Sequence, residues 1–103
     1  MTKKLGSMKP VPRLALARTL TGERVIVSYG RYGGRKAFGV VLGCGPAPWG
    51  GGADCIVLED RQQSGYLSII SLAEVEHIVC PGSGEVLTGN GWLPADECGE
   101  PRE

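Results

Sequence analysis

Short runs of bulky apolar residues, separated by breaks rich in glycine and proline, are the dominant pattern of this 103-residue chain. The densest part extends from Ala37 to Val79, and a break at residues 44–52 divides it. Runs of four to eight apolar residues between turn residues are typical of β-strands. The pattern therefore predicts a small all-β domain.

Strands are expected on both sides of this break. Val25, Val27 and Tyr29 alternate with Arg24, Ile26 and Ser28, which predicts a strand with one buried face. The Gly33-Gly34 pair indicates a hairpin turn, and Gly39 within the next apolar run indicates a bulge or a sharp bend. The expected strands span residues 23–30, 36–43, 54–60, 66–71 and 75–79.

Two segments carry helix signals. Leucines at helix-compatible spacing predict a helix of one to two turns over residues 13–20, which Thr21-Gly22 would end. Ser71 and Glu74 fit the S-x-x-E capping box, in which both side chains satisfy backbone donors of a helical turn. A single turn is therefore expected between the fourth and fifth strands.

These elements predict an all-β fold, a small five-stranded, strongly bent antiparallel barrel with a short N-terminal helix. We expect the barrel domain over residues 13–80, after a flexible basic arm at residues 1–12. Residues 81–103 are expected to form a linker, a hairpin at Asn90-Gly91 and an acidic tail. Without a signal-peptide pattern or an apolar run of membrane-spanning length, we expect a cytoplasmic protein that does not enter membranes.

The order of these motifs resembles the Sm-like small β-barrels, a group that includes the bacterial Sm-like RNA chaperone. The resemblance covers residues 13–80 and is carried by F-G-V-V-L-G at 38–43, D-x-I-V-L-E at 54–59 and I-I-S-L-A-E-V-E-H-I-V at 69–79. The asparagine that Sm proteins carry after the aspartate of the third strand is absent, and the glycine-rich loop at 43–53 is longer. The resemblance therefore implies a fold, and no functional residue is transferred from it.

The formal net charge of zero conceals a division of charge between the two parts of the chain. Residues 1–36 carry nine basic groups and one acid, whereas residues 37–103 carry two basic groups and ten acids. Such asymmetry is a recognised indication of contact with nucleic acid. The alternative is that the two oppositely charged parts neutralise each other within the fold.

The segment at residues 29–36, Y-G-R-Y-G-G-R-K, combines aromatic rings with cations. Aromatic rings stack on unpaired bases and cations contact phosphates, which is how many proteins bind RNA or single-stranded nucleic acid. The alternative is a hairpin turn with solvated charges and Tyr29 in the core. The predicted nucleic-acid-binding residues are Tyr29, Arg31, Tyr32, Arg35 and Lys36.

A second function class is a protein-interaction or assembly module. Small open sheets leave strand edges that pair with another chain or capture an extended peptide, and the runs ADCIVLE and YLSII are suited to such pairing. Trp49 and Trp92 are candidate anchors for a protein partner. This interpretation predicts a homo-oligomer, and an accessory protein of a mobile element would have this composition.

Catalytic, metal and cofactor sites are not indicated. The four cysteines form no C-x-x-C pair, and one histidine does not provide a nucleophile, a base and an orienting acid. The glycine-rich segment lacks the G-x-x-x-x-G-K-[ST] spacing that binds phosphates. We therefore expect a binding protein rather than an enzyme, with no metal and no cofactor.

Overall fold

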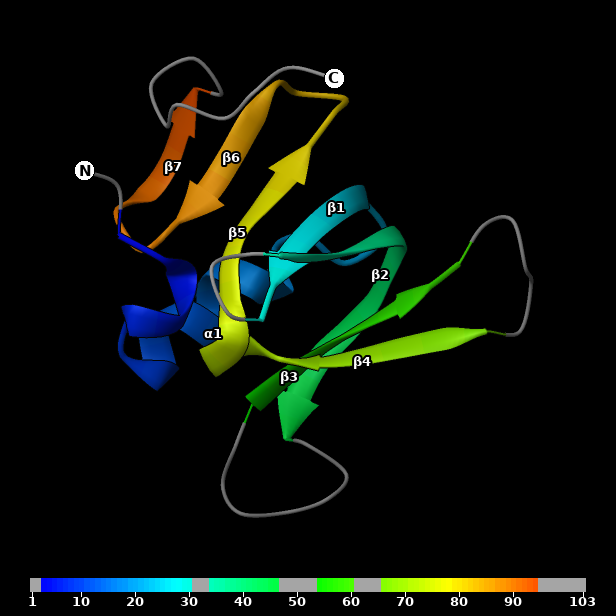
Figure 1. Cartoon of the computed structure of the whole chain (residues 1–103), viewed down its shortest axis with the longest axis horizontal. Coiled ribbons are helices and arrows are strands. Elements are labelled where there is room, and N and C mark those ends of the chain that lie inside the picture. The colour runs from blue at the N-terminus through cyan, green and yellow to red at the C-terminus, as the bar shows by residue number, and fades with distance from the viewer. Residues whose placement is uncertain (1–2, 31–33, 47–53, 61–65, 95–103) are drawn as a thin grey trace.

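The computed structural model describes residues 3–30, 34–46, 54–60 and 66–94, and its elements are labelled in Figure 1. Strands predominate in this part of the chain, and the α-helix is short. The elements are η1 (Leu5–Ser7), α1 (Pro10–Arg18), β1 (Arg24–Tyr29), β2 (Arg35–Pro46), β3 (Asp54–Glu59), β4 (Leu67–Ser71), η3 (Leu72–Glu74), β5 (Val75–Cys80), β6 (Glu85–Thr88) and β7 (Gly91–Pro94). The predicted all-β class is confirmed.

The described strands form one antiparallel sheet of seven strands in the order β4-β3-β2-β1-β5-β6-β7. All five expected strands are present, but the expectation of a five-stranded barrel is wrong, because the sheet has seven strands and is not closed. The C-terminal hairpin belongs to the same sheet, because β6 pairs with β5 and β7 pairs with β6. Since β6 occupies the far side of β5, that side cannot pair with β4, and the sheet stays open.

The sheet bends along strand β2. The first part of this strand pairs with β1 and its second part with β3, and the register shifts between Val41 and Gly43. Near the crossover, Gly39 lies against the backbone of β3, and a Cβ atom placed on it would contact the Glu59 carbonyl oxygen. A glycine is therefore required where these two backbones approach each other.

Within residues 3–12, part of the N-terminal segment is packed into the fold, contrary to the expectation of a flexible arm over residues 1–12. Leu5 is fully buried, and the Lys3 carbonyl oxygen accepts a hydrogen bond of 2.8 Å from the Gly89 amide. Helix α1 begins at Pro10 rather than at residue 13. Proline is tolerated in the first helical turn because the amide it lacks would have no partner inside the helix.

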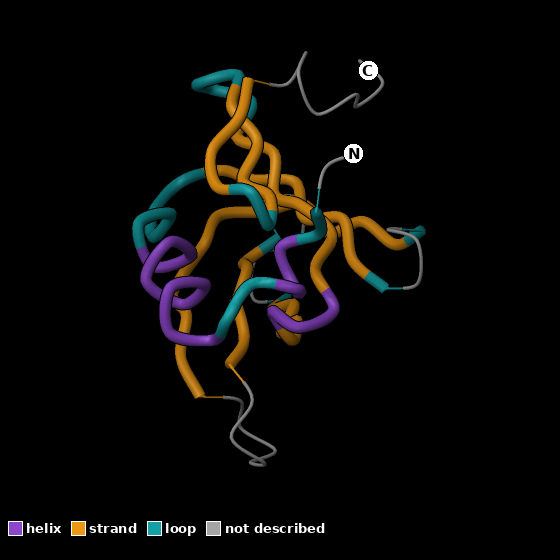
Figure 2. Tube along the Cα trace, turned by 90° about the vertical axis from the view of Figure 1, so that its left-hand side faces the viewer, coloured by secondary structure: helices purple, strands orange, loops and turns teal. Residues whose placement is uncertain are grey.

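The core lies between one face of the sheet and the helical segments, which gather on one side of the molecule (Figure 2). Val25 and Val27 face this core, as their alternation predicts, and Tyr29 packs at its margin. Other fully buried members come from β3, η3, β5 and β6: Ile56, Leu58, Leu72, Val75, Ile78 and Leu87.

Two predicted local elements, the helical turn after Ser71 and the C-terminal hairpin, are present, but their hydrogen bonds or turn residues differ from the prediction. A one-turn helix, η3, follows Ser71, but the Ser71 side chain makes no capping hydrogen bond. The C-terminal hairpin is present, yet Thr88 pairs with Gly91, so its two-residue turn is Gly89-Asn90. Gly91, with φ of 91°, begins β7 instead of ending the turn.

The bend at β2 can be tested with two glycines of the same strand. We expect Gly39→Ala to lower the free energy of unfolding by about 1–3 kcal/mol, because the new methyl group has to displace the β3 backbone. Gly43→Ala is the control, since nothing lies within 4 Å of its Cβ position. Urea unfolding followed by circular dichroism measures both. Equal stability of the two variants would contradict the close approach at Gly39.

Candidate functional site

The predicted nucleic-acid site at residues 29–36 is divided by the fold. Tyr29 is half-buried and packs against the core, so its ring contributes to the packing of the sheet. Arg35 and Lys36 are exposed at the beginning of β2, where they pair across the hairpin with Tyr29 and Ser28. Arg31 and Tyr32 lie outside the described residues. Two of the five predicted residues are thus placed together on the surface.

One acidic residue from another segment, Glu74, lies at the same end of the hairpin. The Gly30 amide donates a hydrogen bond of 2.9 Å to the Glu74 carbonyl oxygen, and Tyr29 pairs with Val75 of β5. Glu74 is itself exposed. The cations at the base of this hairpin therefore share their surroundings with a carboxylate, which weakens the local attraction for a polyanion.

The two predicted tryptophan anchors differ in what the structure describes. Trp92 lies in β7, is half-buried and packs against the core, so much of its surface is already used within the fold. Trp49 lies outside the described residues.

Strand β4 is one edge of the sheet, and among the described residues it pairs with β3 alone. The Asp60 amide donates to the Tyr66 carbonyl oxygen at 3.0 Å. Because hydrogen-bonded and non-hydrogen-bonded pairs alternate along an antiparallel ladder, Ser68 and Ile70 also bond to β3. The backbone amides and carbonyls of Leu67 and Ile69, and the amide of Ser71, then point away from the sheet. The Ser71 carbonyl accepts the first hydrogen bond of η3.

Large apolar side chains are exposed beside this edge. Leu67 is 54% and Ile69 42% exposed, and on β2 Phe38 is 58% exposed. Leu67 and Ile69 lie opposite Glu59 and Val57 of β3. We call this set the β4 apolar surface: Phe38, Leu42, Leu67 and Ile69. The exposed Tyr66 precedes Leu67 and by alternation faces the other side of the sheet. Exposed apolar residues that gather in this way mark interaction sites, whereas scattered ones do not.

Sequence reasoning named the run YLSII as suited to pairing, but it did not show that Phe38 and Leu42 of β2 are exposed, for a specific reason. Between Lys36 and Gly43, both sets of alternating positions are apolar, so periodicity does not show which face is covered. The structure places Val41 in the core and leaves Phe38 exposed. The available signal was the absence of any charged or proline residue in YLSIIS, because exposed edge strands usually carry one.

A hollow of about 650 Å³ lies next to Phe38, where β1, β2 and the end of β3 meet. Its volume is within the range of small-molecule sites. Its lining combines apolar residues with one cationic and one anionic group: Arg24, Val25, Ile26, Phe38, Gly39, Asp60 and Pro81. The hollow extends the apolar surface towards β1.

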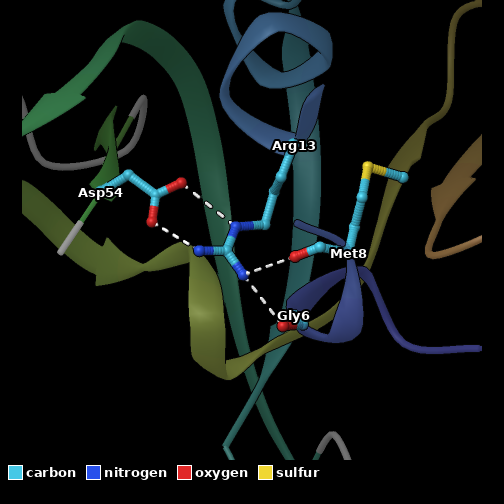
Figure 3. A network of polar contacts seen from close by, with 4 residues as sticks. All are labelled: Gly6, Met8, Arg13 and Asp54. Carbon is cyan, nitrogen blue, oxygen red and sulfur yellow. Dashed lines mark hydrogen bonds and ion pairs between the residues drawn. The ribbon is translucent and has the colours of Figure 1, made fainter. Parts of the chain in front are cut away.

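Arg13 and Asp54 form a buried ion pair that joins the helical segments to the sheet (Figure 3). The Arg13 Nε and Nη2 atoms donate to the Asp54 carboxylate at 3.1 and 2.7 Å. Nη1 donates to the carbonyl oxygens of Gly6 and Met8 at 2.9 and 3.2 Å. With both carboxylate oxygens and all three guanidinium nitrogens bonded within the fold, this pair has the arrangement of a structural link.

Burial keeps the described thiols in their protonated, unreactive form. Burial raises the pKa of Cys44 to about 11, and the neighbouring Cys55 adds to the rise. Burial, with a smaller contribution from the Glu23 and Glu85 carboxylates, raises the pKa of Cys80 to about 11. Burial is also the main cause of the raised pKa of Cys55. At neutral pH all three stay protonated, and the thiolate is the nucleophilic form.

In the described part of the chain, no three histidine, cysteine or acidic side chains come together as a group that could hold a metal ion. None of the described helices has the length and hydropathy needed to cross a membrane.

No protein-family model, curated protein or solved structure matches this chain. Its function therefore has to be argued from its own geometry.

The buried ion pair can be tested by a double-mutant cycle. We expect Asp54→Ala to lower the free energy of unfolding by about 3–5 kcal/mol, because it leaves the Arg13 guanidinium buried without a counter-ion. Arg13→Met should be similarly destabilising. The double variant should cost less than the sum of the single variants by about 1–3 kcal/mol. Denaturant unfolding measures all four proteins, and additive costs would show that the two side chains do not interact.

Proposed function

We propose that this chain is a non-catalytic binding module that pairs its β4 edge with an extended segment of another protein chain. The observation that carries the proposal is the coincidence of two features on one strand. The backbone groups of Leu67 and Ile69 and the amide of Ser71 point outward, and the side chains of Leu67 and Ile69 are exposed. In strand addition, the backbone of the edge supplies hydrogen bonds and its side chains supply selectivity.

The two edges of the sheet are not equivalent, which supports this assignment. Strand β7 has four residues, ends at Pro94 and begins at Gly91 with a φ of 91°. Short edges that contain proline are protected against pairing, because proline has no amide to donate. Strand β4 has five residues and neither a proline nor a charge. Only β4 of the two therefore has the features of a pairing edge.

The β4 apolar surface supplies a second source of binding free energy. Each square ångström of apolar surface removed from water contributes about 25 cal/mol. A partner strand beside β4 would cover part of Leu67 and Ile69. A partner that extends across β3 would also reach the exposed Leu42 and Phe38 of β2.

We further propose that residues 13–80 are related in arrangement to the Sm-like small β-barrels. The helix before the first strand, the long bent β2 and the one-turn η3 between β4 and β5 support this relation. The added β6 and β7 distinguish this chain, because they extend the sheet beyond β5.

Binding of RNA or single-stranded nucleic acid is a second candidate function. It is supported by the exposed side chains of Arg35 and Lys36, which adjoin the end of β2 nearest to the hairpin turn. Tyr29 supports the sheet rather than this site, and the exposed Glu74 opposes the cations. We therefore place this function second.

The edge-pairing function predicts which peptides the protein selects. With the protein immobilised at low density, a displayed library of random 12-residue peptides should yield apolar sequences rich in β-branched residues and free of internal proline. Ile69→Lys should abolish their binding, because it places a charge in the centre of the new strand pair. Val11→Lys is the control, since Val11 is 81% exposed on α1. Selected peptides that bind Ile69→Lys as tightly as the unaltered protein would refute the function.

The nucleic-acid function predicts a salt-dependent affinity for single-stranded RNA. Arg35→Glu with Lys36→Glu should weaken binding and reduce the slope of log K against log salt by about 1.4, since each phosphate contact contributes about 0.7. Lys4→Glu with Lys9→Glu changes the net charge equally and should bind as the unaltered protein does. Fluorescence anisotropy of a labelled oligonucleotide measures both variants. An equal loss in the two would indicate non-specific attraction rather than a site on the hairpin.

A further inference from the structure

We infer that the partner of the β4 edge is a second copy of this chain, paired antiparallel, β4 to β4, about a twofold axis at Ile69. This inference rests on the proposed function, because it names the partner of the same edge. It follows from the direction of the backbone groups, the composition of β4 and the difference between the two sheet edges.

The outward backbone groups fix the register of such a pair. Leu67 and Ile69 present their amides and carbonyls to the open side, and Ser71 its amide, as the Asp60–Tyr66 hydrogen bond at 3.0 Å requires. The Ser71 carbonyl accepts the first hydrogen bond of η3. In an antiparallel pair, these residues have to face outward residues of the other copy. Placing Ile69 opposite Ile69 also places Leu67 opposite Ser71, and the full strands overlap. That arrangement forms about four hydrogen bonds, because the Ile69 pair exchanges two and the Ser71 amide of each copy donates one to Leu67 of the other.

A second symmetric register forms about as many bonds. If Leu67 faced Ile69 of the other copy, about four hydrogen bonds would form, but Ser71 of each strand would have no partner. The register centred on Ile69 is the one in which the two strands overlap over their full length, so it is the register of the inferred dimer.

The side chains are compatible with this register. Directly opposite residues of an antiparallel pair lie on the same face, so the two Ile69 side chains would meet on the exposed face of the sheet. Leu67 would lie diagonally across from Ile69 of the other copy, within reach of an apolar contact. Strand β4 has no charged residue, and the chain has a formal net charge of zero. Neither local nor overall repulsion opposes the meeting of two copies.

Pairing between different edges is less favourable. A head-to-tail contact would join β4 to β7, which has four residues and ends at Pro94. Both sides of β5 are already paired, with β1 and β6. A β4–β4 contact uses the same surface on both copies and closes after two, whereas head-to-tail contacts form rings or fibres. The structure therefore favours a closed dimer.

The first measurement is the mass in solution, by light scattering and sedimentation equilibrium over a range of concentrations. We expect twice the mass of one chain for the unaltered protein and for Val11→Lys, and the mass of one chain for Ile69→Lys. Ile69 is 42% exposed, so lysine should be accommodated in the monomer, which circular dichroism checks. A monomer at all concentrations, or an oligomer that Ile69→Lys does not dissociate, would overturn the inference.

The second measurement is disulfide cross-linking, which tests the register without relying on a destabilising substitution. Opposite Cα atoms of a hydrogen-bonded pair are about 5.5 Å apart, within the span of a disulfide. Ile69→Cys should therefore form linked dimers on mild oxidation, above the background of the unaltered protein with its native cysteines. Leu67→Cys alone should not, because its own copies lie about 13 Å apart. A mixture of Leu67→Cys and Ser71→Cys should link.

The outcomes separate this inference from the proposed function. A monomer that still selects apolar peptides through Ile69 would overturn the self-pairing and leave the edge as a site for another protein. A dimer in which Ile69→Cys does not link would overturn the register centred on Ile69. Loss of both self-association and peptide selection would refute the two together.

Discussion

The buried contact between Arg13 and Asp54 holds the layers of this protein together. One guanidinium group bonds to a carboxylate at the beginning of β3 and to two carbonyls of the N-terminal segment, while its own backbone lies in α1. Burial of two charges costs several kcal/mol unless the remaining donors and acceptors are satisfied. Because those partners come from three segments, α1, η1 and β3 have to keep their relative positions for the pair to be stable.

The same constraint determines which surface is left uncovered. The helical segments that Arg13 holds lie on one face of the sheet (Figure 2), and β2 bends the sheet around the core on that face. The other face receives no helix from the described part of the chain, so Phe38 and Ile69 remain exposed. The C-terminal hairpin covers β5 and ends the sheet with a protected strand, which leaves β4 as the accessible edge. The β4 apolar surface is thus exposed because the helices cover the other face of the sheet and the C-terminal hairpin covers the other edge.

Local signals predicted the elements of this fold better than their assembly. Alternation at Val25 and Val27, the glycine-rich turns and the turn after Ser71 are set by neighbouring residues, and the corresponding elements are present. The pairing of β6 with β5 is a long-range contact that no local pattern specifies. The ion pair was missed because Arg13 and Asp54 are 41 residues apart and each resembles an ordinary surface residue. For the candidate site, the sequence indicated strand edges and named the run YLSII, but only the structure distinguishes the exposed Ile69 from the buried Ile70.

The division of charge along the chain acquires a different meaning in the folded protein. Arg13 belongs to the basic part and Asp54 to the acidic part, and they neutralise each other in the interior. At the surface, the acidic part brings Glu74 to the basic hairpin. Some of the basic and acidic groups whose separation along the chain suggested a polyanion partner therefore neutralise each other within the fold. Arg35 and Lys36 have an acidic residue, Glu74, near them. The β4 edge has no such internal compensation among the described residues, because its outward backbone groups and apolar side chains face water. Pairing with another strand would remove that apolar surface from water, which is why the edge is the stronger functional candidate.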